Sequence, residues 1–393
     1  MSALPNGAFS GSLPFLSDQF LFDEDIVYFN HGSFGACPRP VFEAYQRWQR
    51  ELERQPVEFI QRRLEDLLAE ARARLGAYAG ASPDRLVFVP NATYGVNVVA
   101  RSLKLQPGDE VLGTNHEYGA VNNTWRYACQ VHDARYVTTP IDMPLNSADQ
   151  FVDALWAGVT ERTRAISISH ITSPTALIFP IKPVIDRARE AGITTVIDGA
   201  HAPGQIDLAL DELGADYYTG NAHKWLCAPK GAAFLYSAAG PESLLEPLVV
   251  SHGWNSGRSG SRLFDNFSWT GTMDPSAYLS VPAAIDFQTE NDWPAVRAAC
   301  HALASELRSA IQDITGLEPI CPDSAEWYSQ MFVARLPLDR LEHLRDSLWP
   351  RYRIEVPAFE RDGEAFTRIS IQAYNSPHDA ERFVDALSEL LRD

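Results

Sequence analysis

The hydrophobic pattern of the chain alternates between long stretches with helical spacing and short apolar runs. Apolar residues recur at helical spacing from Val41 to Tyr78, with an interruption near Pro56. Helical segments then alternate with apolar runs at 86–89, 110–113, 134–138, 165–170, 194–198, 217–220 and 232–236. Strands that alternate with helices predict an α/β fold whose mainly parallel sheet lies between helices.

The pattern changes after the last of these runs. A Gly- and Ser-rich stretch covers about 250–274, and helical spacing resumes at Ser276. Further strand-like runs lie at 331–335, 353–356 and 367–371, and a closing helical segment begins at His378. We therefore predict an N-terminal arm, a large ligand-binding domain and a smaller α/β C-terminal domain, which span residues 1–20, 21–275 and 276–393.

The composition adds a strong acidic balance to this picture. The 393 residues, 45% of them hydrophobic and 21% charged, are typical of a globular enzyme with a large core. Lys and Arg total 33 against 51 Asp and Glu, which gives a formal net charge of −18. Because such a surface repels phosphate backbones, we do not expect a nucleic-acid partner.

Targeting signals and metal patterns are not recognisable in the sequence. No apolar run approaches the roughly 20 residues that a membrane helix needs, and the N-terminus lacks the basic region and apolar core of a signal peptide. We therefore predict a cytoplasmic protein without a membrane partner. The five cysteines form neither a zinc pattern nor a disulfide framework. They are Cys37, Cys129, Cys227, Cys300 and Cys321.

Two ionisable side chains follow neighbouring runs of the predicted sheet. The run at 194–198 ends at Asp198, and a polar turn 26 residues later ends in His223 and Lys224. Ligands of such sheets bind outside the carboxyl ends of strands. Pyridoxal 5'-phosphate (PLP) needs an amine that binds its aldehyde, an acid at its ring nitrogen and donors for its phosphate. Lys224 and Asp198 fit the first two needs, and Asn221 and His223 the third, although a solvated lysine is the common alternative.

A second polar segment, Asn91 to Gly95, follows the run at 86–89 and opens a helical segment. The free amides of a helix N-terminus bind phosphate well, and the hydroxyl of Thr93 could assist them. The same residue would also suit a simple N-cap. The motif leaves both interpretations open.

Several motifs together indicate a family. The strings DGAHAPG (198–204), ADYYTGNAHKW (215–225) and APKG (228–231) resemble the class V aminotransferases, which include cysteine desulfurases, kynureninase and isopenicillin N epimerase. YFNHGSFGACP (28–38) and NHEYGAV (115–121) are most similar to the isopenicillin N epimerase-like branch. The resemblance covers nearly the whole chain. It implies the fold type I of PLP-dependent transferases, a PLP cofactor and a homodimer with shared active sites.

The resemblance implies three contacts with the cofactor phosphate. Thr93 and Tyr94 would lie at the phosphate, and Thr272, in the segment Thr-Gly-Thr at 270–272, would reach the phosphate of the neighbouring subunit. Asn221 departs from the desulfurase pattern, in which a serine often stands three residues before the lysine. A carboxamide can also donate to a phosphate.

The resemblance also implies contacts with the cofactor ring and the substrate. His201 would donate to the phenolic oxygen, and Tyr118 would stack on the ring face opposite Lys224. Arg368 would bind the α-carboxylate of the substrate through its planar guanidinium. The alternatives are a core tyrosine for Tyr118 and an exposed surface arginine for Arg368.

The segment that contains Asn30, His31 and Ser33 lies where the family's N-terminal strand enters the substrate pocket. Asn30 and Ser33 are therefore candidates for substrate binding. His31 is a candidate for a second acid or base, against the alternative of a structural histidine. We expect no role beyond a structural one for His116.

These residues predict an enzyme that acts at the α-carbon of an amino acid. Lys224 would hold the cofactor, release it to the substrate amine and then remove the α-proton. The resemblance favours an epimerase or racemase, in which Tyr118, His31 or a water returns a proton from the other face. A C–S lyase, an aminotransferase and an inert PLP-binding sensor are the alternatives. Cysteine desulfurases of this family carry a nucleophilic cysteine on a loop shortly before the arginine that binds the carboxylate. The corresponding segment here, 356–364, contains no cysteine, so a cysteine-dependent desulfurase is disfavoured.

Overall fold

The computed structural model describes residues 16–23 and 25–392, so most of the predicted arm lies outside the described residues. A seven-stranded sheet with the order β2-β8-β7-β6-β5-β3-β4 forms its centre. Strand β8 is antiparallel to its neighbours β2 and β7, and the other neighbouring pairs are parallel. The strands are β2 (Leu86–Val89), β3 (Glu110–Thr114), β4 (Arg135–Thr139), β5 (Thr163–Ser169), β6 (Thr194–Asp198), β7 (Tyr217–Asn221) and β8 (Ala233–Ser237).

Each of the seven apolar runs forms one of these strands, and the mainly parallel α/β sheet is confirmed. The intervening segments form helices that contact the sheet; α5, for example, touches β2, β6, β7 and β8, and α8 touches β6. These helices are α5 (Ala92–Ser102), α6 (Gly119–Val131), α7 (Ala148–Trp156), α8 (Ile181–Glu190) and α9 (Leu210–Leu213).

The helical stretch before the sheet is interrupted at Pro56, as the sequence predicts. The chain leaves its helical conformation at Gln55, whose side chain accepts hydrogen bonds from the amides of Val57 and Glu58 and so starts the next helix. Gly80, in a left-handed conformation, ends the last helix of the stretch. The elements are α1 (His31–Phe34), α2 (Arg39–Arg54), α3 (Pro56–Glu58), a π-helical stretch (Phe59–Arg63) and α4 (Leu64–Ala79).

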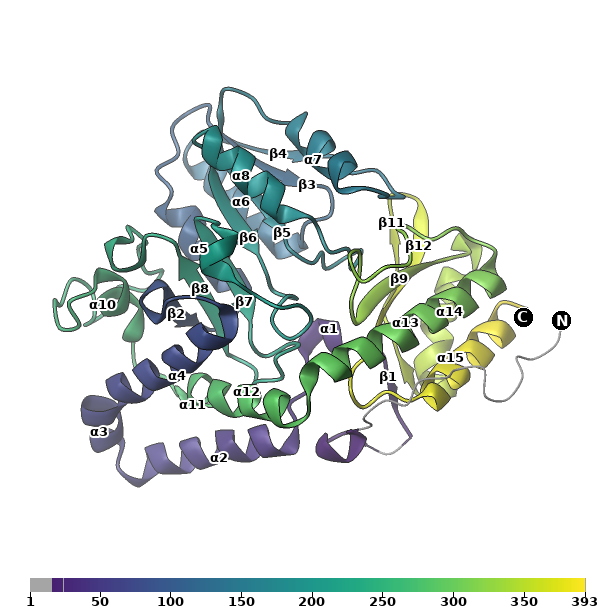
Figure 1. The fold of residues 1–393 in the computed structure, drawn as a ribbon, viewed down its shortest axis with the longest axis horizontal. Coiled ribbons are helices and arrows are strands. Elements are labelled where there is room, and N and C mark those ends of the chain that lie inside the picture. Colours follow the sequence, from purple (N-terminus) through teal and green to yellow (C-terminus); the bar gives the residue numbers. More distant parts are fainter. Residues whose placement is uncertain (1–15, 24, 393) are drawn as a thin grey trace.

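The C-terminal part carries a second, smaller sheet, which lies to the right of the large sheet in Figure 1. Its antiparallel order is β11-β12-β9. The strands are β9 (Met331–Leu336), β11 (Ala358–Arg361) and β12 (Glu364–Ser370). The helices from the Gly- and Ser-rich stretch onward are α10 (Arg262–Ser268), α11 (Ser276–Leu279), α12 (Val281–Glu290), α13 (Trp293–Thr315), α14 (Leu341–Tyr352) and α15 (Pro377–Leu390).

The N-terminal segment pairs with the C-terminal strands. Strand β1 (Val27–Tyr28) runs parallel to β10 (Ile354–Glu355), and Asn30 forms a bridge with Ser370 at the end of β12. In Figure 1, β1 accordingly lies beside the C-terminal elements, and α1 lies between them and the large sheet. The predicted domain limits at 20 and 275 stay a prediction. Residues 27, 28 and 30, however, pair with C-terminal residues and not with strands of the large sheet. Among the described residues, none of the helices has both the length and the apolar character to cross a membrane.

Candidate active site

Asp198 and Lys224 meet at the carboxyl edge of the large sheet. Asp198 is the last residue of β6 and pairs in register with Thr219 of β7, and the turn with Lys224 follows the end of β7. The pKa of Lys224 is lowered to about 7, chiefly by burial and in part by the Arg368 cation, while the Asp198 anion opposes both effects. The predicted acid and amine therefore share one site.

The amine of Lys224 contacts the imidazole of His201. Nζ lies 3.1 Å from Nε2, and the indole Nε1–H of Trp225 donates to Nδ1 of the same ring over 3.3 Å. Because Nδ1 accepts this bond, the proton of the neutral ring is on Nε2. Burial, with Lys224 next, keeps the pKa of His201 well below its usual range, so the ring stays neutral. His201 thus presents an N–H donor beside the amine, as the predicted bond to a phenolic oxygen requires.

Asp198 is suited to a protonated ring nitrogen. Its carboxyl is buried, and Oδ1 accepts the amide of Ala200 at 3.0 Å. Burial raises the pKa of Asp198, while the Ala200 amide and the Lys224 cation act in the opposite direction. Because desolvation destabilises the charged form of this buried carboxyl, a cation beside it, such as a protonated ring nitrogen, would stabilise that form.

The expected phosphate site lies at the start of α5. The helix begins at Ala92, and the side chain of Asn91 caps it by accepting the amide of Tyr94 over 2.8 Å. The interpretation of Thr93 as the N-cap is therefore wrong, because Thr93 is the second residue of the helix and lies two positions after the N-cap Asn91. Asn221 holds the same helix start, since its Oδ1 accepts the amide of Ala92 at 2.8 Å. This bond uses the carbonyl oxygen of Asn221 and leaves its predicted role, donation from the amide nitrogen, a prediction.

His223 follows β7 in the same turn as Lys224. Its Nδ1 donates to the carbonyl of Ala232 over 3.0 Å, so Nε2 of the neutral ring is an acceptor. Burial lowers the pKa of His223 to about 4. The predicted donation from His223 to a phosphate requires that the phosphate anion raise this pKa and protonate the ring.

Arg368 is a buried cation with an unused donor. Its Nη1 donates to the carbonyl and hydroxyl oxygens of Ser173 over 2.7 and 3.1 Å, and Nη2 donates to the hydroxyl of Ser33 over 2.9 Å. The side chain is only 8% exposed, so the alternative of a surface arginine is wrong. Its Nε is buried and has no partner within the described part of the chain. Burial lowers the pKa of Arg368 to about 10. A carboxylate would supply the missing acceptor.

Asn30 and Ser33 form a chain of hydrogen bonds that ends at Arg368. The hydroxyl of Ser33 donates to Oδ1 of Asn30 over 2.5 Å, and Nδ2 of Asn30 donates to Glu355 over 3.0 Å. Ser33 therefore lies beside the guanidinium of Arg368 and Asn30 holds its hydroxyl, while the predicted roles of both residues in substrate binding stay predictions.

His31 is fully buried beneath the Lys224 turn. Nε2 donates to the carbonyl of Lys224 and Nδ1 accepts the hydroxyl of Tyr374, each over 3.0 Å. Burial lowers the pKa of His31 to about 3. An acid–base role for His31 stays a prediction, but these contacts favour the structural alternative, in which the ring supports the backbone of Lys224.

Tyr118 precedes α6 and is 48% exposed, so the alternative of a core tyrosine is wrong. Arg368 interacts electrostatically with both Lys224 and Tyr118. Arg368 therefore lies within electrostatic range of both side chains, and the stacking of Tyr118 on the cofactor stays a prediction. His116 is buried with both ring nitrogens hydrogen-bonded, which agrees with its predicted structural role.

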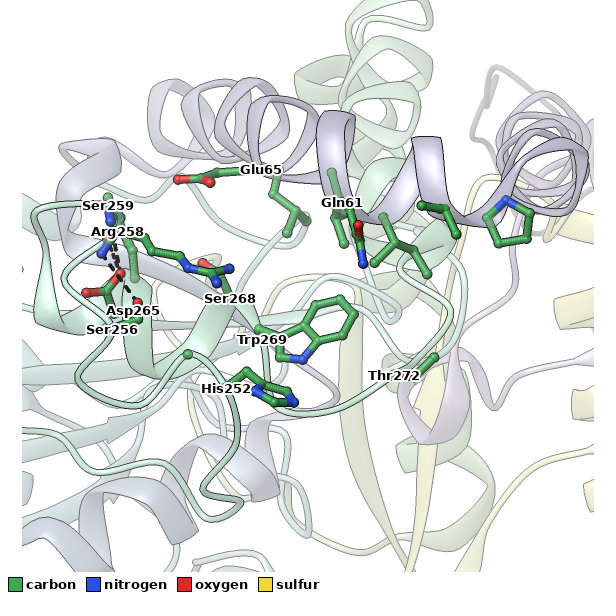
Figure 2. A pocket seen from close by; sticks show the side chains of 17 residues that line it. Gln61, Glu65, His252, Ser256, Arg258, Ser259, Asp265, Ser268, Trp269 and Thr272 are labelled. Carbon is green, nitrogen blue, oxygen red and sulfur yellow. Dashed lines mark hydrogen bonds between the residues drawn. The ribbon is translucent and has the colours of Figure 1, made fainter.

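Thr272 lines a cavity whose lining includes neither Lys224 nor Arg368, although its neighbours Gly271 and Met273 line a second cavity together with Tyr94. Thr272 is exposed, and the first cavity, of about 680 Å³, lies between the helical stretch 56–68 and the segment 252–272. Figure 2 shows Thr272 near Trp269 and His252, with Gln61 on the facing helix. Its predicted contact with the cofactor of a neighbouring subunit stays a prediction.

Comparisons with known proteins agree with this arrangement. The family model described as aminotransferase class V matches residues 27–383. The chain belongs to the class V aminotransferase family. It is 38% identical to isopenicillin N epimerase from Amycolatopsis lactamdurans, with 95% of this chain and 97% of the relative covered. It is 31% identical to a probable chloroplastic L-cysteine desulfhydrase from Arabidopsis thaliana, with 94% and 84% covered.

A solved structure supports the fold of this class V aminotransferase family member. A C-DES variant with glycine covalently linked to the PLP cofactor superposes with a TM-score of 0.79 at 19% identity, and 95% of this chain and 98% of that chain are covered. The protein is a PLP-dependent enzyme of fold type I, as predicted. The residues described above fit that cofactor: an amine with a lowered pKa, a buried acid and a donor imidazole converge on one sheet edge.

The sequence did not indicate the contacts of two further residues with the predicted site residues Arg368 and His201. Ser173 binds Arg368 through both its carbonyl and its hydroxyl, and Trp225 sets the tautomer of His201. Ser173 lies shortly after the end of β5, next to β6 in the sheet. Its position after a strand end was a usable signal, whereas the contact of Trp225 depends on how the turn folds back.

Proposed function

We propose that this enzyme is an epimerase or racemase that inverts the α-carbon of an amino-acid substrate. The observation that carries the proposal is the buried guanidinium of Arg368, whose Nε has no partner among the described residues and whose charge interacts with Lys224 and Tyr118. A carboxylate bound to Arg368 would hold the α-carbon between an amine and a phenol. The similarity to isopenicillin N epimerase supports this reaction over the alternatives.

In this proposal each side chain has one task. Bound PLP supplies the electron sink that stabilises negative charge at the α-carbon. Arg368, held by Ser33 and Ser173, orients the substrate carboxylate. Lys224, whose pKa of about 7 leaves a large neutral fraction at neutral pH, takes the α-proton on its own face. Tyr118, stacked on the opposite face, returns a proton directly or through a water.

A C–S lyase is the second candidate function. The similarity to the L-cysteine desulfhydrase supports it, and the same removal of the α-proton by Lys224 begins that reaction. The lyase expels a sulfur substituent from the β-carbon and needs no acid on the opposite face. Transamination is a third outcome of the same site, with less support from the relatives.

We further propose a cytoplasmic homodimer in which Thr272 reaches the cofactor phosphate of the neighbouring subunit. The exposed position of Thr272, in a cavity separate from the residues around its own Lys224, supports a contribution to another copy. A Thr272→Ala variant should bind PLP more weakly while the subunits stay associated.

The proposed reaction can be tested with holoenzyme in deuterium oxide. Isopenicillin N and L-cysteine are supplied separately, and NMR and chiral chromatography follow the α-position and the products. Epimerisation predicts inversion with deuterium at the α-carbon of isopenicillin N and no keto acid. Pyruvate and sulfide from L-cysteine, without any inversion, would refute the epimerase and support the lyase.

Two variants complete the test. Lys224→Ala should abolish exchange for either reaction. Tyr118→Phe keeps the aromatic ring but removes the hydroxyl, so it should reduce inversion far more than exchange that returns deuterium on the original face. Equal losses of both would argue against Tyr118 as the opposite-face acid.

A further inference from the structure

Glu117, immediately before Tyr118, is buried at the carboxyl edge of the large sheet with only 4% of its surface exposed. Both of its carboxyl oxygens accept hydrogen bonds from hydroxyls. Thr114 donates to Oε1 and Ser169 donates to Oε2, each over 2.6 Å. Thr114 is the last residue of β3 and Ser169 the last residue of β5. One carboxyl therefore ties the turn after β3 to the ends of two neighbouring strands.

This position is costly for a carboxyl group and lies next to the cofactor acid. Ser169, which binds Glu117, is the register partner of Asp198 in the adjacent strand. The pKa of Glu117 is raised to about 7, chiefly by burial and in part by the charge of Asp198, against the opposing effect of the two hydroxyl bonds. Burial of a carboxyl group costs free energy of desolvation. Its retention here indicates that the two hydrogen bonds, which join the turn to the ends of β3 and β5, are important for the site.

The Tyr118 turn has other restraints besides Glu117. The amide of Asn115 donates to the carbonyl of Thr139 in β4, and the buried ring of His116 is hydrogen-bonded at both nitrogens. Tyr118 is the N-terminal boundary of α6, but its side chain makes no capping bond. On the opposite side of the turn, Arg361 of β11 donates to the carbonyl of Asn115 over 2.6 Å. Between these points, the carboxyl of Glu117 is the link from the turn to the sheet next to Asp198.

We propose that Glu117 is a positioning residue of the cofactor site, which fixes the Tyr118 turn to the ends of β3 and β5 and so sets the tyrosine ring against the cofactor face. The proposal rests on the proposed stacking of Tyr118. Glu117 itself touches neither the substrate nor the reacting atoms in this assignment. It aligns the stacked residue with the acid at the ring nitrogen, because Ser169, which binds Glu117, is also the register partner of Asp198.

The test is a double-mutant cycle on cofactor binding. Apoprotein is titrated with PLP, and its visible absorbance gives the dissociation constant for the wild type, Glu117→Ala, Tyr118→Ala and the double variant. Loss of the stacked ring should weaken binding about 10-fold. Glu117→Ala should weaken it about 5-fold. Because Glu117 acts through Tyr118, the double variant should also lose about 10-fold, whereas independent effects would multiply to about 50-fold.

Glu110 offers a matched control on the same strand. It begins β3, is likewise 4% exposed and accepts hydrogen bonds from Thr160 and Arg162. Glu110→Ala should lower the unfolding temperature and leave PLP binding unchanged. A similar loss of PLP affinity in Glu110→Ala would mean that any buried glutamate of this sheet has the same effect, and would overturn the assignment.

Further outcomes are equally decisive. A 50-fold loss in the double variant, or unchanged binding in Glu117→Ala, would overturn the proposal. If Glu117→Ala does not fold, the cycle is run with Glu117→Gln, which keeps one acceptor and should show a smaller effect that is again masked by Tyr118→Ala. Unchanged PLP binding in Tyr118→Ala would remove the stacking on which the proposal rests. The exchange assay with isopenicillin N would still decide the reaction, so the two failures can be told apart.

Discussion

Replacement of Arg368 by lysine tests whether the carboxylate pocket has been identified correctly. In the structure, Nη1 and Nη2 are held by Ser173 and Ser33, and the buried Nε has no partner among the described residues. A substrate carboxylate would therefore bind to Nε and share one of the held nitrogens. A lysine at this position keeps the positive charge but presents a single nitrogen that cannot form this paired contact.

The size of the effect follows from the loss of one charge-assisted hydrogen bond. Such a bond contributes about 1.5–3 kcal/mol, which corresponds to about a 10- to 150-fold change in affinity. Arg368→Lys should weaken binding of L-alanine by this factor. Binding of L-alaninamide, which has no carboxylate, should change much less, so the preference for the acid over the amide should fall by a similar factor.

The assay is the change in visible absorbance when each compound is added to the PLP-loaded protein. Arg335→Lys is a suitable control, because Arg335 lies on the neighbouring strand β9 and pairs with Glu364 over 2.8 Å. That variant should keep the preference of the wild type. An unchanged preference in Arg368→Lys would refute the assignment of the carboxylate to this arginine.

Two further predictions concern the Lys224 turn. Since the pKa of Lys224 is lowered to about 7, the amine is charged below this pH and free above it, so the rate of PLP loading should rise about tenfold per pH unit below 7 and then level off. Arg368→Gln removes a cation and should move the midpoint to higher pH; a midpoint that stays in place in stopped-flow measurements would contradict this electrostatic contact. Gly35→Ala should impair both folding and PLP loading, because its φ is 72° and a Cβ there would lie 2.0 Å from the carbonyl oxygen of His223. Gly316 has a similar φ of 67° but open space around the added carbon. Gly316→Ala should therefore cost only about 1 kcal/mol of stability and leave PLP loading intact. Equal shifts of the unfolding temperature in the two variants would argue against a close contact between Gly35 and the carbonyl of His223.

The sequence predicted the large sheet well, because each of its strands is a compact apolar run bounded by polar turns. Strand β11 was not predicted, and an N-terminal strand was implied only by the resemblance to the family. Strand β1 has two residues, and its partner β10 lies more than 300 positions later in the chain, so no local pattern marks it. Strand β11 has only partly buried or exposed residues and lacks a clear apolar run.

The site followed a similar division. Asp198 and Lys224 could be predicted from strand ends, which a sequence reveals. The contacts of Arg368 with Ser33 and Ser173 could not, because they join three distant segments. The burial of His31 beneath Lys224 was also hidden, since an isolated histidine has the same local signature whether it supports a turn or exchanges protons.

The hydrogen bond between Ser33 and Arg368 also has a consequence for biosynthesis, because it joins residues 335 positions apart. During translation the N-terminal segment leaves the ribosome long before β10 and β12 exist, so β1 waits without its partner while the large sheet assembles. The pocket that we propose for the substrate carboxylate can close only when almost the whole chain has been made. A nascent chain that stops before β12 could still form the Lys224 edge of the large sheet, but it would lack the means to hold a substrate there.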